Sequence, residues 1–420
     1  MRILVIGTGG REHALARKLA TEGGTEVHAA PGNPGIAAVA TLHDVDPLDG
    51  AAVADLAESL GADLVVVGPE APLVAGVADV VRDRGIAVFG PSKAAAMLEG
   101  SKAFSKEVME AAGVPTARSF TCTTPEEAVA ALDEFGPPYV VKDDGLAAGK
   151  GVVVTPDREA ALAHAAACER VVIEEYLDGP EVSLFAVCGH DGSGVSAWPL
   201  QPAQDFKRIF DGDGGANTGG MGSYSPLTWA PAGLTDEVME TVVRPTLEEM
   251  ERRGTPFTGL LFVGLALTSR GPRVVEFNAR FGDPETQSLM PLLASPLAPV
   301  LWESATGAGL TSEPSFSAEA AVTVVLASAG YPEGSSKGDV ITGVEDAERL
   351  DGVHVIHAGT ALDDDGRLVT AGGRVLAVVG TGTDLEEARA TAYAAVRLIH
   401  FDGAQHRTDI ALRAAAGALR

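Results

Sequence analysis

The sequence predicts an α/β protein of several domains, beginning with a doubly wound parallel sheet. In the first hundred residues, short Val/Ile-rich segments alternate with Ala-rich segments of helical period. The short segments are apolar throughout, as parallel strands are when both faces of their sheet are covered. With 420 residues, the chain is long enough for about three domains with separate cores.

The N-terminal elements follow one another in a regular order. Strands are expected at residues 2–7, 26–30, 62–68 and 86–90, and helices at residues 11–23, 48–61 and 72–85. Single strands that alternate with helices of this length form parallel pairs joined by crossovers. We therefore expect residues 1–100 to form one domain around a parallel sheet.

The pattern changes at residue 101. Helices are expected at 101–113, 124–136, 157–169 and 234–254, and strands at 138–142, 151–155, 171–176, 258–267 and 273–278. The strands at 138–142 and 151–155 flank a glycine-rich segment and predict an antiparallel hairpin in a smaller α+β unit. Residues 211–222, half of them glycine, are expected to form a loop.

A last unit follows a Ser/Pro/Gly-rich connector near residues 306–317. Its strands are expected at 320–328, 354–359 and 373–380, and its helix at 384–399. These elements predict a compact sheet covered by one helix. The expected domains are therefore residues 1–100, 101–307 and 318–420.

The charge balance excludes two classes of partner. The chain has 58 Asp and Glu residues against 31 Lys and Arg residues, which gives a net charge of −27. Such a surface repels the phosphates of nucleic acids and anionic lipids, so we expect neither a nucleic acid nor a membrane as partner. An anionic substrate would need a basic pocket or a metal ion against this background.

No feature of the sequence indicates export. The first apolar run, residues 3–6, is too short for the core of a signal peptide, and no run reaches the ~18 apolar residues of a membrane span. Cys122, Cys168 and Cys188 lack the spacing of metal ligands, and their odd, sparse count suits a reducing compartment. We expect a monomeric, cytoplasmic protein.

A glycine-rich turn follows the first strand and leads into a helix that begins with Arg11 and Glu12. A dinucleotide-binding fingerprint would need glycine at the position of Glu12 and an acidic residue after the second strand, and the sequence has neither. The turn still favours an anion, because backbone N–H groups at a helix N-terminus are free to bind one.

Two more loops of the first sheet, PGNPG and GPEAP, contribute Asn33 and Glu70. The carboxyl ends of parallel strands meet at one edge of a sheet, where open α/β folds bind ligands. We therefore expect Gly9, Gly10 and these two side chains to meet there, with Glu70 facing an amine. The alternative is a set of tight turns without a ligand.

KDDGLAAGKG, residues 142–151, differs from a phosphate-binding P-loop. Only three residues separate Gly145 from Gly149, and Gly151 occupies the position of the magnesium-binding hydroxyl. The segment joins two expected strands, and a glycine hairpin of this kind can fold its amides over a triphosphate. Lys142 would add a point charge beside the phosphates. Glycine hairpins are common, so this segment alone does not establish a nucleotide site.

VVIEEYLDGPEVS is an apolar strand that runs into two carboxylates, Glu174 and Glu175, and then into a turn. The backbone of such a segment can pair with adenine, while the later Glu181 holds ribose hydroxyls. The alternative is a strand end exposed to solvent, and this segment alone favours that alternative.

The loop at residues 211–222 follows a basic pair that includes Lys207. It is not an EF-hand, because the twelfth position, which needs a bidentate Glu, is Gly222. A glycine-rich loop behind two basic residues is better suited to hold an anion. Asn217 and Thr218 add hydrogen-bonding groups, which a plain linker would not need.

VVEFNARFGDPETQ, residues 274–287, is the most informative stretch. Alternation along a strand puts Glu276 and Asn278 on one face, with Arg280 two residues further on. Carboxylate and amide oxygens suit Mg²⁺, which keeps water and phosphate oxygens as its other ligands. Arg280 beside them would stabilise a transferring phosphoryl group. A polar edge strand is the alternative, but apolar residues lie between these positions.

Taken together, these segments resemble the glycinamide ribonucleotide synthetases, or phosphoribosylamine–glycine ligases, a family of ATP-grasp enzymes. The resemblance covers essentially the whole chain and rests on GTGGREHALA, APGNPG, VGPEAPLV, LEGSKAF, DGLAAGKG, IEEYLDG, DFKRIFDGDGGANTGGMGSYSP, EFNARFGDPETQ, HAGT and AGGRVL, in family order. RFGDPETQ is nearly diagnostic. The resemblance implies a Rossmann-like N-terminal domain, an ATP-grasp domain of two α+β subdomains with a lid at about 117–185, and a small C-terminal α+β domain.

The resemblance also implies a role for particular residues. ATP would contact Lys102, Lys142, Gly149, Gly151, Glu174, Glu175, Tyr176, Leu177, Glu181 and Lys207, with the glycine hairpin as a flap. Mg²⁺ or Mn²⁺ would be held by Glu276 and Asn278. Substrates would contact Gly9, Gly10, Arg11, Glu12, Asn33, Glu70, Asp205, Asn217, Thr218, Arg280 and Asp283. Lys142, Lys207 and Arg280 would serve catalysis.

The implied reaction uses ATP to join glycine to 5-phosphoribosylamine in purine synthesis, through glycyl phosphate. Positioning and electrostatic stabilisation are sufficient for these two displacements, in keeping with a sequence that shows no nucleophile triad. The chain departs from the common family pattern at Asp143, at Ala216 and in a short segment before residue 171. Strand 258–267 supplies no acidic third metal ligand.

Three other functions stay open at this point. The chain resembles ATP-grasp ligases that join other small carboxylates and amines, and ADP release with different substrates would separate these. An NAD-dependent oxidoreductase is disfavoured by Glu12. A nucleotide sensor without turnover is disfavoured by the pair of Glu276 and Asn278.

Overall fold

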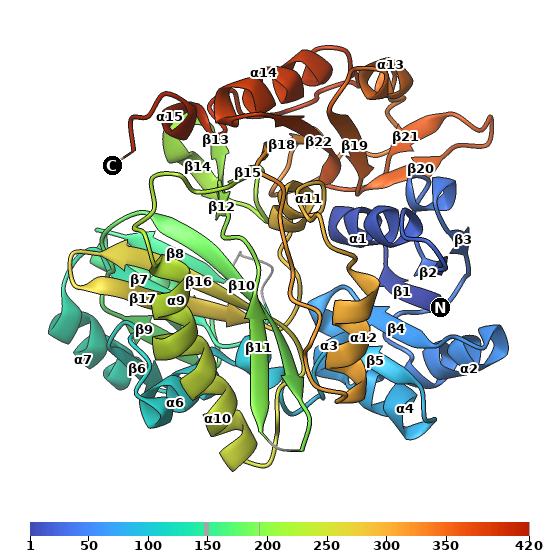
Figure 1. The fold of residues 1–420 in the computed structure, drawn as a ribbon. Helices are drawn as coiled ribbons and strands as arrows, with labels where there is room; N and C mark the ends of the chain where they lie inside the picture. Colours follow the sequence, from blue (N-terminus) through green and yellow to red (C-terminus); the bar gives the residue numbers. More distant parts are fainter. Residues whose placement is uncertain (147–150, 193, 420) are drawn as a thin grey trace.

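The computed structural model describes residues 1–146, 151–192 and 194–419. Three parts of the chain surround a common centre (Figure 1): an N-terminal part in blue, a middle part from teal to yellow, and a C-terminal part in orange and red. The chain termini lie on opposite sides of the molecule. This arrangement brings loops from all three parts together.

The N-terminal part is a parallel sheet. Its strands are β1 (Arg2–Gly7), β2 (Glu26–Pro31), β3 (Thr41–Leu42), β4 (Leu64–Val67) and β5 (Ala87–Phe89), in the order β3-β2-β1-β4-β5. The strands pair in parallel, and the chain passes from β3 to the other side of β1 through α2 (Gly50–Leu60). This order is doubly wound, so the predicted fold class is confirmed for this part. The central strands are buried, which explains their apolar sequences.

The helices of this part differ from expectation at one place. α1 (Gly10–Ala20) lies where it was predicted, but the single helix expected at residues 72–85 is two helices, α3 (Glu70–Ala75) and α4 (Val77–Asp83). Gly76 separates them with φ +96°, a left-handed conformation that ends a helix at little cost for glycine. A short 3₁₀ turn, Ile36–Ala38, follows β2.

The middle part contains two four-stranded antiparallel sheets. The first, here called the lid sheet, has the order β6-β9-β7-β8 and consists of β6 (Ser119–Cys122), β7 (Tyr139–Asp143), β8 (Val152–Thr155) and β9 (Val171–Glu174). α7 (Pro125–Phe135) and α8 (Arg158–Ala166) pack on it through a small apolar core. The predicted hairpin is the pair β7–β8. α5 (Met97–Gly100) and α6 (Lys102–Ala112) connect the first sheet to this one.

The second sheet of the middle part, here called the grasp sheet, has the order β11-β10-β16-β17. Its strands are β10 (Glu181–His190), β11 (Val195–Pro199), β16 (Gly259–Thr268) and β17 (Gly271–Asn278). The helix predicted at residues 234–254 is interrupted, since α9 (Leu234–Val238) and α10 (Arg244–Arg252) are joined by a π-helical turn, Met239–Val243. Pro245 follows that turn and has no N–H to continue regular α-helical bonding.

The C-terminal sheet takes two of its strands from the middle of the chain. Its order is β12-β15-β18-β22-β19, built from β12 (Gln204–Asp205), β15 (Gly222–Ser225), β18 (Ala320–Ala327), β22 (Arg374–Gly382) and β19 (Val353–His357). α14 (Leu385–Val396) covers it, as predicted. The remaining elements here are α13 (Val344–Glu348), the hairpin of β20 (Thr360–Leu362) with β21 (Leu368–Thr370), and α15 (Leu412–Ala415).

The loop predicted at residues 211–222 is wrong in its first half. β13 (Arg208–Phe210) and β14 (Gly214–Asn217) form an antiparallel hairpin, with a 3₁₀ turn at Asp211–Asp213. Gly212 and Asp213 adopt positive φ angles of +67° and +56°, which lets the chain reverse within three residues. Glycine content indicated the turn but concealed the two short strands beside it.

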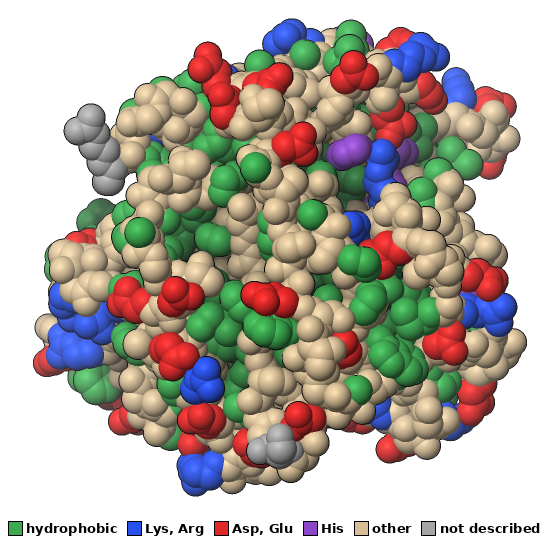
Figure 2. All heavy atoms as spheres, in the orientation of Figure 1, with side chains coloured by type: hydrophobic (Ala, Val, Ile, Leu, Met, Phe, Trp, Pro, Cys, Tyr) green, Lys and Arg blue, Asp and Glu red, His purple; other side chains and the backbone are tan. Residues whose placement is uncertain are grey.

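α11 (Glu285–Leu289) packs against the C-terminal sheet and α1, and α12 (Ala298–Thr306) packs between β5 of the first sheet and β10 of the grasp sheet. Within the described parts of the chain, no helix is both long and apolar enough to cross a membrane. Acidic side chains are spread over the face shown in Figure 2, with basic ones among them. The predicted α/β architecture, with a pair of antiparallel sheets between two other units, is confirmed.

Candidate active site

A large cavity of about 1560 Å³ opens where the three parts of the chain meet. Its walls come from the N-terminal loops, α6, the lid sheet, β17, the β13–β14 hairpin and residues 407–419, here called the C-terminal segment. Most of the residues predicted for the site line this cavity: Arg11, Glu70, Lys102, Lys142, Gly151, Glu174, Glu175, Tyr176, Leu177, Glu181, Asp205, Lys207, Asn217, Thr218, Glu276, Asn278, Arg280 and Asp283. Folding therefore brings together residues that are far apart in the sequence.

Two lysines share one buried carboxylate at the lid end of the cavity. Lys142 Nζ lies 2.8 Å from one oxygen of Glu174, and Lys106 Nζ lies 3.0 Å from the other. Lys142 also donates to the Val275 carbonyl at 3.1 Å, which ties the lid sheet to β17. Burial lowers the pKa of Lys106, although Glu174 opposes the shift. Glu174 thus fixes two amines at the cavity wall.

Lys102, in the first turn of α6, holds the start of the glycine hairpin. Its amine donates to the carbonyls of Asp143 and Gly145, at 2.8 and 2.9 Å. Burial lowers its pKa. Gly151 lines the cavity beside β8, whereas the predicted phosphate contact Gly149 lies outside the described residues.

The chain leaves β9 at Glu174 and runs along the cavity edge through Leu177 without regular structure. The carboxylate of Glu175 accepts a hydrogen bond from the Arg118 backbone N–H at 3.1 Å and one from Arg270 at 3.2 Å. These bonds engage the Glu175 side chain. The Glu175 backbone N–H also donates to the Arg118 carbonyl at 3.0 Å, so this segment offers a ligand the exposed Tyr176 side chain and the backbone after Glu175.

A second group of charges lies around Lys207. Its amine is 2.7 Å from the Glu181 carboxylate, and Asp205 and Glu276 lie near enough to act on it. Burial alone would lower the pKa of Lys207, but these three carboxylates raise it well above its ordinary value. Burial also raises the pKa of Asp205, which Glu181 and Glu276 reinforce. Lys207 therefore keeps its charge under all ordinary conditions.

Glu276 and Asn278 are the predicted metal ligands, and both line the cavity from β17. Burial would raise the pKa of Glu276, but Lys207, Lys142 and Lys102 hold it below its ordinary value, so the carboxylate is ionised. Among the described residues, no three His, Cys, Asp or Glu side chains are arranged to hold a metal. One ionised carboxylate and one amide oxygen fit Mg²⁺, which commonly takes few protein ligands and completes its shell with water and phosphate.

Arg280 joins the middle part of the chain to the first sheet. Its guanidinium lies 3.0 Å from Glu99 and 3.3 Å from Glu70, and Arg11 lies 3.9 Å from the same Glu70 carboxylate. Burial would lower the pKa of Arg280, but Glu99 and Glu70 raise it. Glu99 also accepts the backbone N–H of Ala279 at 2.7 Å. Two carboxylates thus fix a cation at the cavity wall.

Glu285 is a buried carboxyl between Arg280 and the grasp sheet, with only 3% of its surface exposed. Burial raises its pKa to about 7, and the neighbouring Asp205 adds to the shift. Ser183 donates a hydrogen bond to it at 3.0 Å. The carboxyl therefore changes charge near neutral pH.

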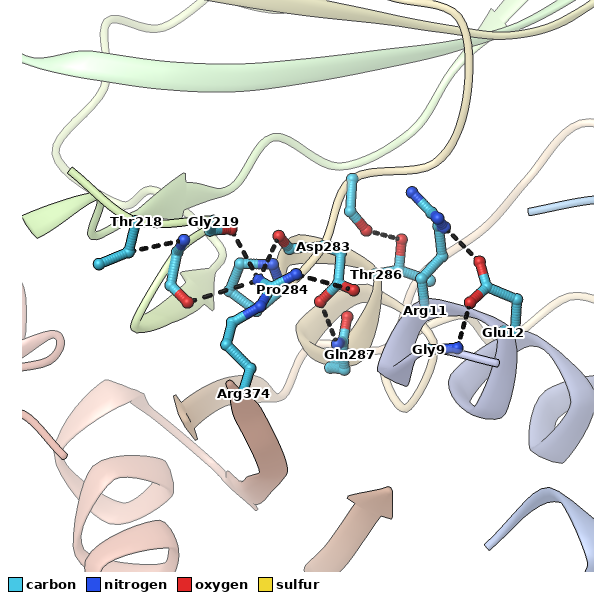
Figure 3. Close-up of polar contacts among 12 residues, drawn as sticks. Gly9, Arg11, Glu12, Thr218, Gly219, Asp283, Pro284, Thr286, Gln287 and Arg374 are labelled. Atoms are coloured by element: carbon cyan, nitrogen blue, oxygen red, sulfur yellow. Dashed lines mark hydrogen bonds and ion pairs between the residues drawn. The ribbon is translucent and has the colours of Figure 1, made fainter. Parts of the chain in front are cut away.

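Four predicted residues of the N-terminal loops do not line the cavity: Gly9, Gly10, Glu12 and Asn33. Glu12 is 1% exposed, and its carboxylate accepts the Gly9 N–H at 2.6 Å and pairs with Arg11 at 2.5 Å (Figure 3). Asn33 donates to the carbonyls of Thr8 and His357. These side chains fasten the loop and α1, whereas Arg11, Glu70 and Glu99 of the N-terminal part line the cavity.

Asp283 and Arg374 join the C-terminal sheet to this region (Figure 3). Arg374 lies 3.1 Å from the Asp283 carboxylate and donates to the carbonyls of Asp283 and Gly219, at 2.8 and 2.6 Å. Gln287 donates to the same carboxylate at 2.7 Å. Burial would raise the pKa of Asp283, but Arg374 and Arg11 hold it below its ordinary value. The result is a network of paired charges that joins the C-terminal sheet to the cavity wall.

The sequence analysis did not single out Glu99, Lys106, Glu285 or Arg374, although all four line the cavity. Lys106 lies one helical turn after Lys102, so the period of α6 contained a signal for it. Glu99, Glu285 and Arg374 lie inside LEGSKAF, RFGDPETQ and AGGRVL, segments that were noted as units. Arg407 also lines the cavity, and its neighbours in the sequence gave no signal.

Comparison with known proteins agrees with this geometry. Three family models match in order: the N domain of phosphoribosylglycinamide synthetase at residues 1–99, its ATP-grasp (A) domain at 100–286 and its C domain at 321–413. A phosphoribosylamine–glycine ligase from Streptomyces coelicolor is 64% identical over 419 residues, covering 99% of this chain and all of that protein. The same-named protein of Leifsonia xyli is 55% identical over 422 residues, with 99% and 100% covered.

A solved structure shows the same arrangement of domains. The crystal structure of phosphoribosylamine–glycine ligase from Thermotoga maritima superposes with a TM-score of 0.83 at 36% identity, covering 98% of this chain and 100% of that one. The family models match three consecutive domains. The relatives match almost the whole chain at high identity, and the solved structure has the same fold. The chain belongs to the phosphoribosylglycinamide synthetase family.

Proposed function

We propose that the protein is an ATP-dependent carbon–nitrogen ligase that joins glycine to 5-phosphoribosylamine, giving glycinamide ribonucleotide, ADP and phosphate in purine synthesis. The observation that carries the proposal is one cavity lined by Lys102, Lys142 and Lys207 together with Glu276 and Asn278, the residues proposed to hold a metal. Membership of the family and 64% identity to a protein of that name support the choice of substrates.

ATP binds between the lid sheet and the grasp sheet in this proposal. The segment from Glu174 to Leu177 pairs with adenine through its backbone, and Glu181 holds the ribose hydroxyls. Lys102 and Lys142 are fixed at the phosphate end by their carbonyl and carboxylate partners. Such fixed charges stabilise a transferring phosphoryl group without having to reorganise during the reaction.

Glu276 and Asn278 would hold Mg²⁺ or Mn²⁺, which supplies charge neutralisation at the phosphates when bound. Lys207 keeps its positive charge beside them because three carboxylates raise its pKa. The glycine carboxylate attacks the γ-phosphate and forms glycyl phosphate, and ADP leaves. Arg280, held by Glu70 and Glu99, stabilises the negative charge that develops on the transferred group.

The second substrate lies toward the N-terminal and C-terminal parts. Arg11, Arg374 and the loop around Asn217 and Thr218 present positive charge and hydrogen-bonding groups to a sugar phosphate. Glu70 faces the amine. The amine attacks the acyl carbon of glycyl phosphate, the bond to phosphate breaks, and the amide product forms. Positioning of the two substrates is the main contribution of the protein to this step.

ADP release tests the proposal directly. Turnover of ATP is expected only when both glycine and phosphoribosylamine are present, because each half-reaction needs its own nucleophile. Alanine, serine and other small acids, and ammonia or other phosphorylated amines, serve as comparisons. Faster turnover with a different acid or amine would assign the chain to another ATP-grasp ligase activity, and ATP binding without any turnover would indicate a sensor.

A further inference from the structure

Arg407 is among the largest side chains that the fold buries almost completely, with 1% of its surface exposed. Its guanidinium makes a bidentate pair with Asp409 through two hydrogen bonds of 2.7 Å. It also donates to the Asp213 carboxylate at 2.8 Å and to the Arg208 carbonyl at 3.2 Å. Its flat face lies over the ring of Phe206 at 4.9 Å. A buried arginine with so many partners has a strongly defined position.

These contacts connect two distant segments of the chain. Asp409 belongs to the C-terminal segment, whereas the other three partners flank or form the β13–β14 hairpin. The neighbouring bonds strengthen the junction: the Thr408 N–H donates to Asp211 and the Gly212 N–H donates to Asp409, both at 2.8 Å. Residues 407–409 therefore hold the base and the turn of the hairpin at the same time.

Lys207 lies between the two residues that Arg407 contacts at the base of the hairpin. Phe206 packs under the guanidinium and the Arg208 carbonyl accepts from it. The Lys207 side chain itself is 40% exposed, and its amine pairs with Glu181 at 2.7 Å across the cavity. Because this side chain is long and flexible, the backbone on either side influences where the amine can reach. That backbone is held within the hairpin, where the Thr218 N–H and hydroxyl donate to the Lys207 carbonyl at 2.8 Å, and also from the C-terminal segment through Arg407.

We propose that Arg407 is a positioning residue for Lys207, and through it for the phosphate end of the active site. This inference rests on the proposed function, in which Lys207 stabilises the ATP phosphates. A displacement of about 1 Å in a group that acts on a transition state can reduce turnover by about a hundredfold. Without the Arg407 guanidinium, the β13–β14 hairpin loses its hydrogen bonds to this side chain. Lys207 then keeps its charge, but its amine is displaced from the ATP phosphates.

The test is a double-mutant cycle of Arg407→Lys with Lys207→Met, in the full-length protein. Lysine keeps the charge at position 407 but cannot reproduce the planar, multiply bonded fork. Alone, Arg407→Lys is expected to lower kcat about tenfold to a hundredfold, with the KM for glycine within about twofold. In the Lys207→Met background it is expected to change kcat less than about twofold, because the group it positions is already gone.

Arg389→Lys is a matched control. Arg389 also lies over an aromatic ring, Tyr393 at 4.6 Å, and also holds the C-terminal segment, through the carbonyls of Ile410 and Thr408. These hydrogen bonds hold the C-terminal segment, whereas those of Arg407 also reach the β13–β14 hairpin. We expect this variant to lose thermal stability but to keep kcat within about twofold. Equal losses of kcat in the two variants would mean that Arg407 acts only through stability.

Asp213→Asn provides a second approach if Arg407→Lys does not fold. It neutralises one of the two carboxylates that pair with Arg407, and the Asp213 side chain is 71% exposed, so the fold should tolerate the change. The same cycle is measured on the affinity for a non-hydrolysable ATP analogue, which requires no ligase turnover. Wild-type protein that is inactive with glycine and phosphoribosylamine would overturn the proposed function alone. If the loss of kcat or of analogue affinity in a double variant equals the product of the losses in the two single variants, positions 407 and 207 act independently. That result would overturn the positioning role.

Discussion

At the scale of single residues, the cavity shows how neighbours set the charge of each group. Glu276 and Glu285 are both buried carboxyls, yet the pKa of Glu276 is lowered and that of Glu285 is raised to about 7. Burial acts on both in the same direction, so the difference comes from partners. Three lysines face Glu276, whereas Glu285 has Asp205 beside it. The ionised carboxylate is the one suited to a metal.

Glu276→Gln should reduce turnover by about a hundredfold to a thousandfold and leave the fold intact, because a neutral amide is a poor ligand for Mg²⁺ and charge neutralisation matters most in the transition state. The measurement is kcat against Mg²⁺ concentration, with circular dichroism to follow the fold. Glu251→Gln is the control, since Glu251 pairs with His190 at the surface. Near-normal turnover of Glu276→Gln at low Mg²⁺ would remove Glu276 from the metal site.

At the scale of secondary structure elements, close packing of α14 on the C-terminal sheet depends on a glycine. A Cβ built on Gly380 in β22 would lie 2.3 Å from the Ala392 nitrogen and 2.5 Å from the Ala388 oxygen, both backbone atoms of α14. Backbone atoms in a helix cannot move aside individually. The small residue therefore sets the distance between the helix and the sheet.

Gly380→Ala is expected to lower the free energy of unfolding by about 1–3 kcal/mol, because the added methyl group forces α14 away from β22. Gly23→Ala is the matched control, since a Cβ on Gly23 has no described neighbour within 4 Å. Urea denaturation of the two variants gives the comparison. If both variants unfold at the same urea concentration as the wild type, α14 can shift without loss and the close contact is not limiting.

At the scale of the whole molecule, the cavity has two ends that belong to different parts of the chain. Lys142 lies in the lid sheet beside Glu174, whereas Glu70 begins α3 of the N-terminal part and lies beside Arg280. The two side chains share no direct partner among these contacts. Substitutions at the two ends should therefore act almost independently.

Lys142→Met is expected to weaken binding of an ATP analogue about tenfold or more, through loss of a charged phosphate partner, while glycinamide ribonucleotide still binds. Glu70→Gln is expected to raise the KM for phosphoribosylamine and leave ATP affinity almost unchanged. Calorimetric titration of each variant with both ligands makes the comparison. If Glu70→Gln weakened nucleotide binding as much as Lys142→Met, the first sheet would form part of the ATP site.

The N-terminal and C-terminal parts also meet through two histidines, His13, which is buried, and His357, which is half-buried. His13 on α1 is 3% exposed, and its Nδ1 accepts the His357 backbone N–H at 2.8 Å. Burial lowers the pKa of His13 to about 3 and that of His357 to about 4, so both are neutral in the folded protein at neutral pH. In the unfolded chain they would take up protons near pH 6.5. Acid therefore favours the unfolded state.

The sign of the pH effect follows from this difference. Between pH 6.5 and the lowered pKa values the unfolded chain binds more protons, so stability falls as the pH falls. At pH 5, His13 alone should reduce the free energy of unfolding by about 2 kcal/mol. His13→Asn keeps an acceptor for the His357 N–H and removes the titrating group, so its stability should fall less steeply between pH 6.5 and 5. Parallel pH curves for the variant and the wild type would contradict this account.

Much of the fold and of the site could be predicted from local sequence. The parallel order of the first sheet follows from apolar strands that alternate with helices, because such strands need cover on both faces. The placing of Glu276 and Asn278 together on β17 and the hairpin of β7 and β8 were also visible, since both depend on residues close together in the chain. The roles assigned to individual site residues stay predictions.

One error comes from contacts between distant segments. Glycine content suggested a loop at residues 211–222, but β13 and β14 pair there and the C-terminal segment holds their turn. The Glu12 carboxylate, expected to contact substrate, is engaged by the N–H of Gly9 and by Arg11, both close to it in the sequence, and its role toward substrate stays a prediction. The sequence by itself determined the chemistry available to this protein, through short segments that carry lysines, carboxylates and glycines. Only the tertiary structure decided which of those groups face the cavity. Whether a side chain still has hydrogen-bonding or charged groups available for a ligand depends on its partners in the fold, and many of these are far away in the sequence.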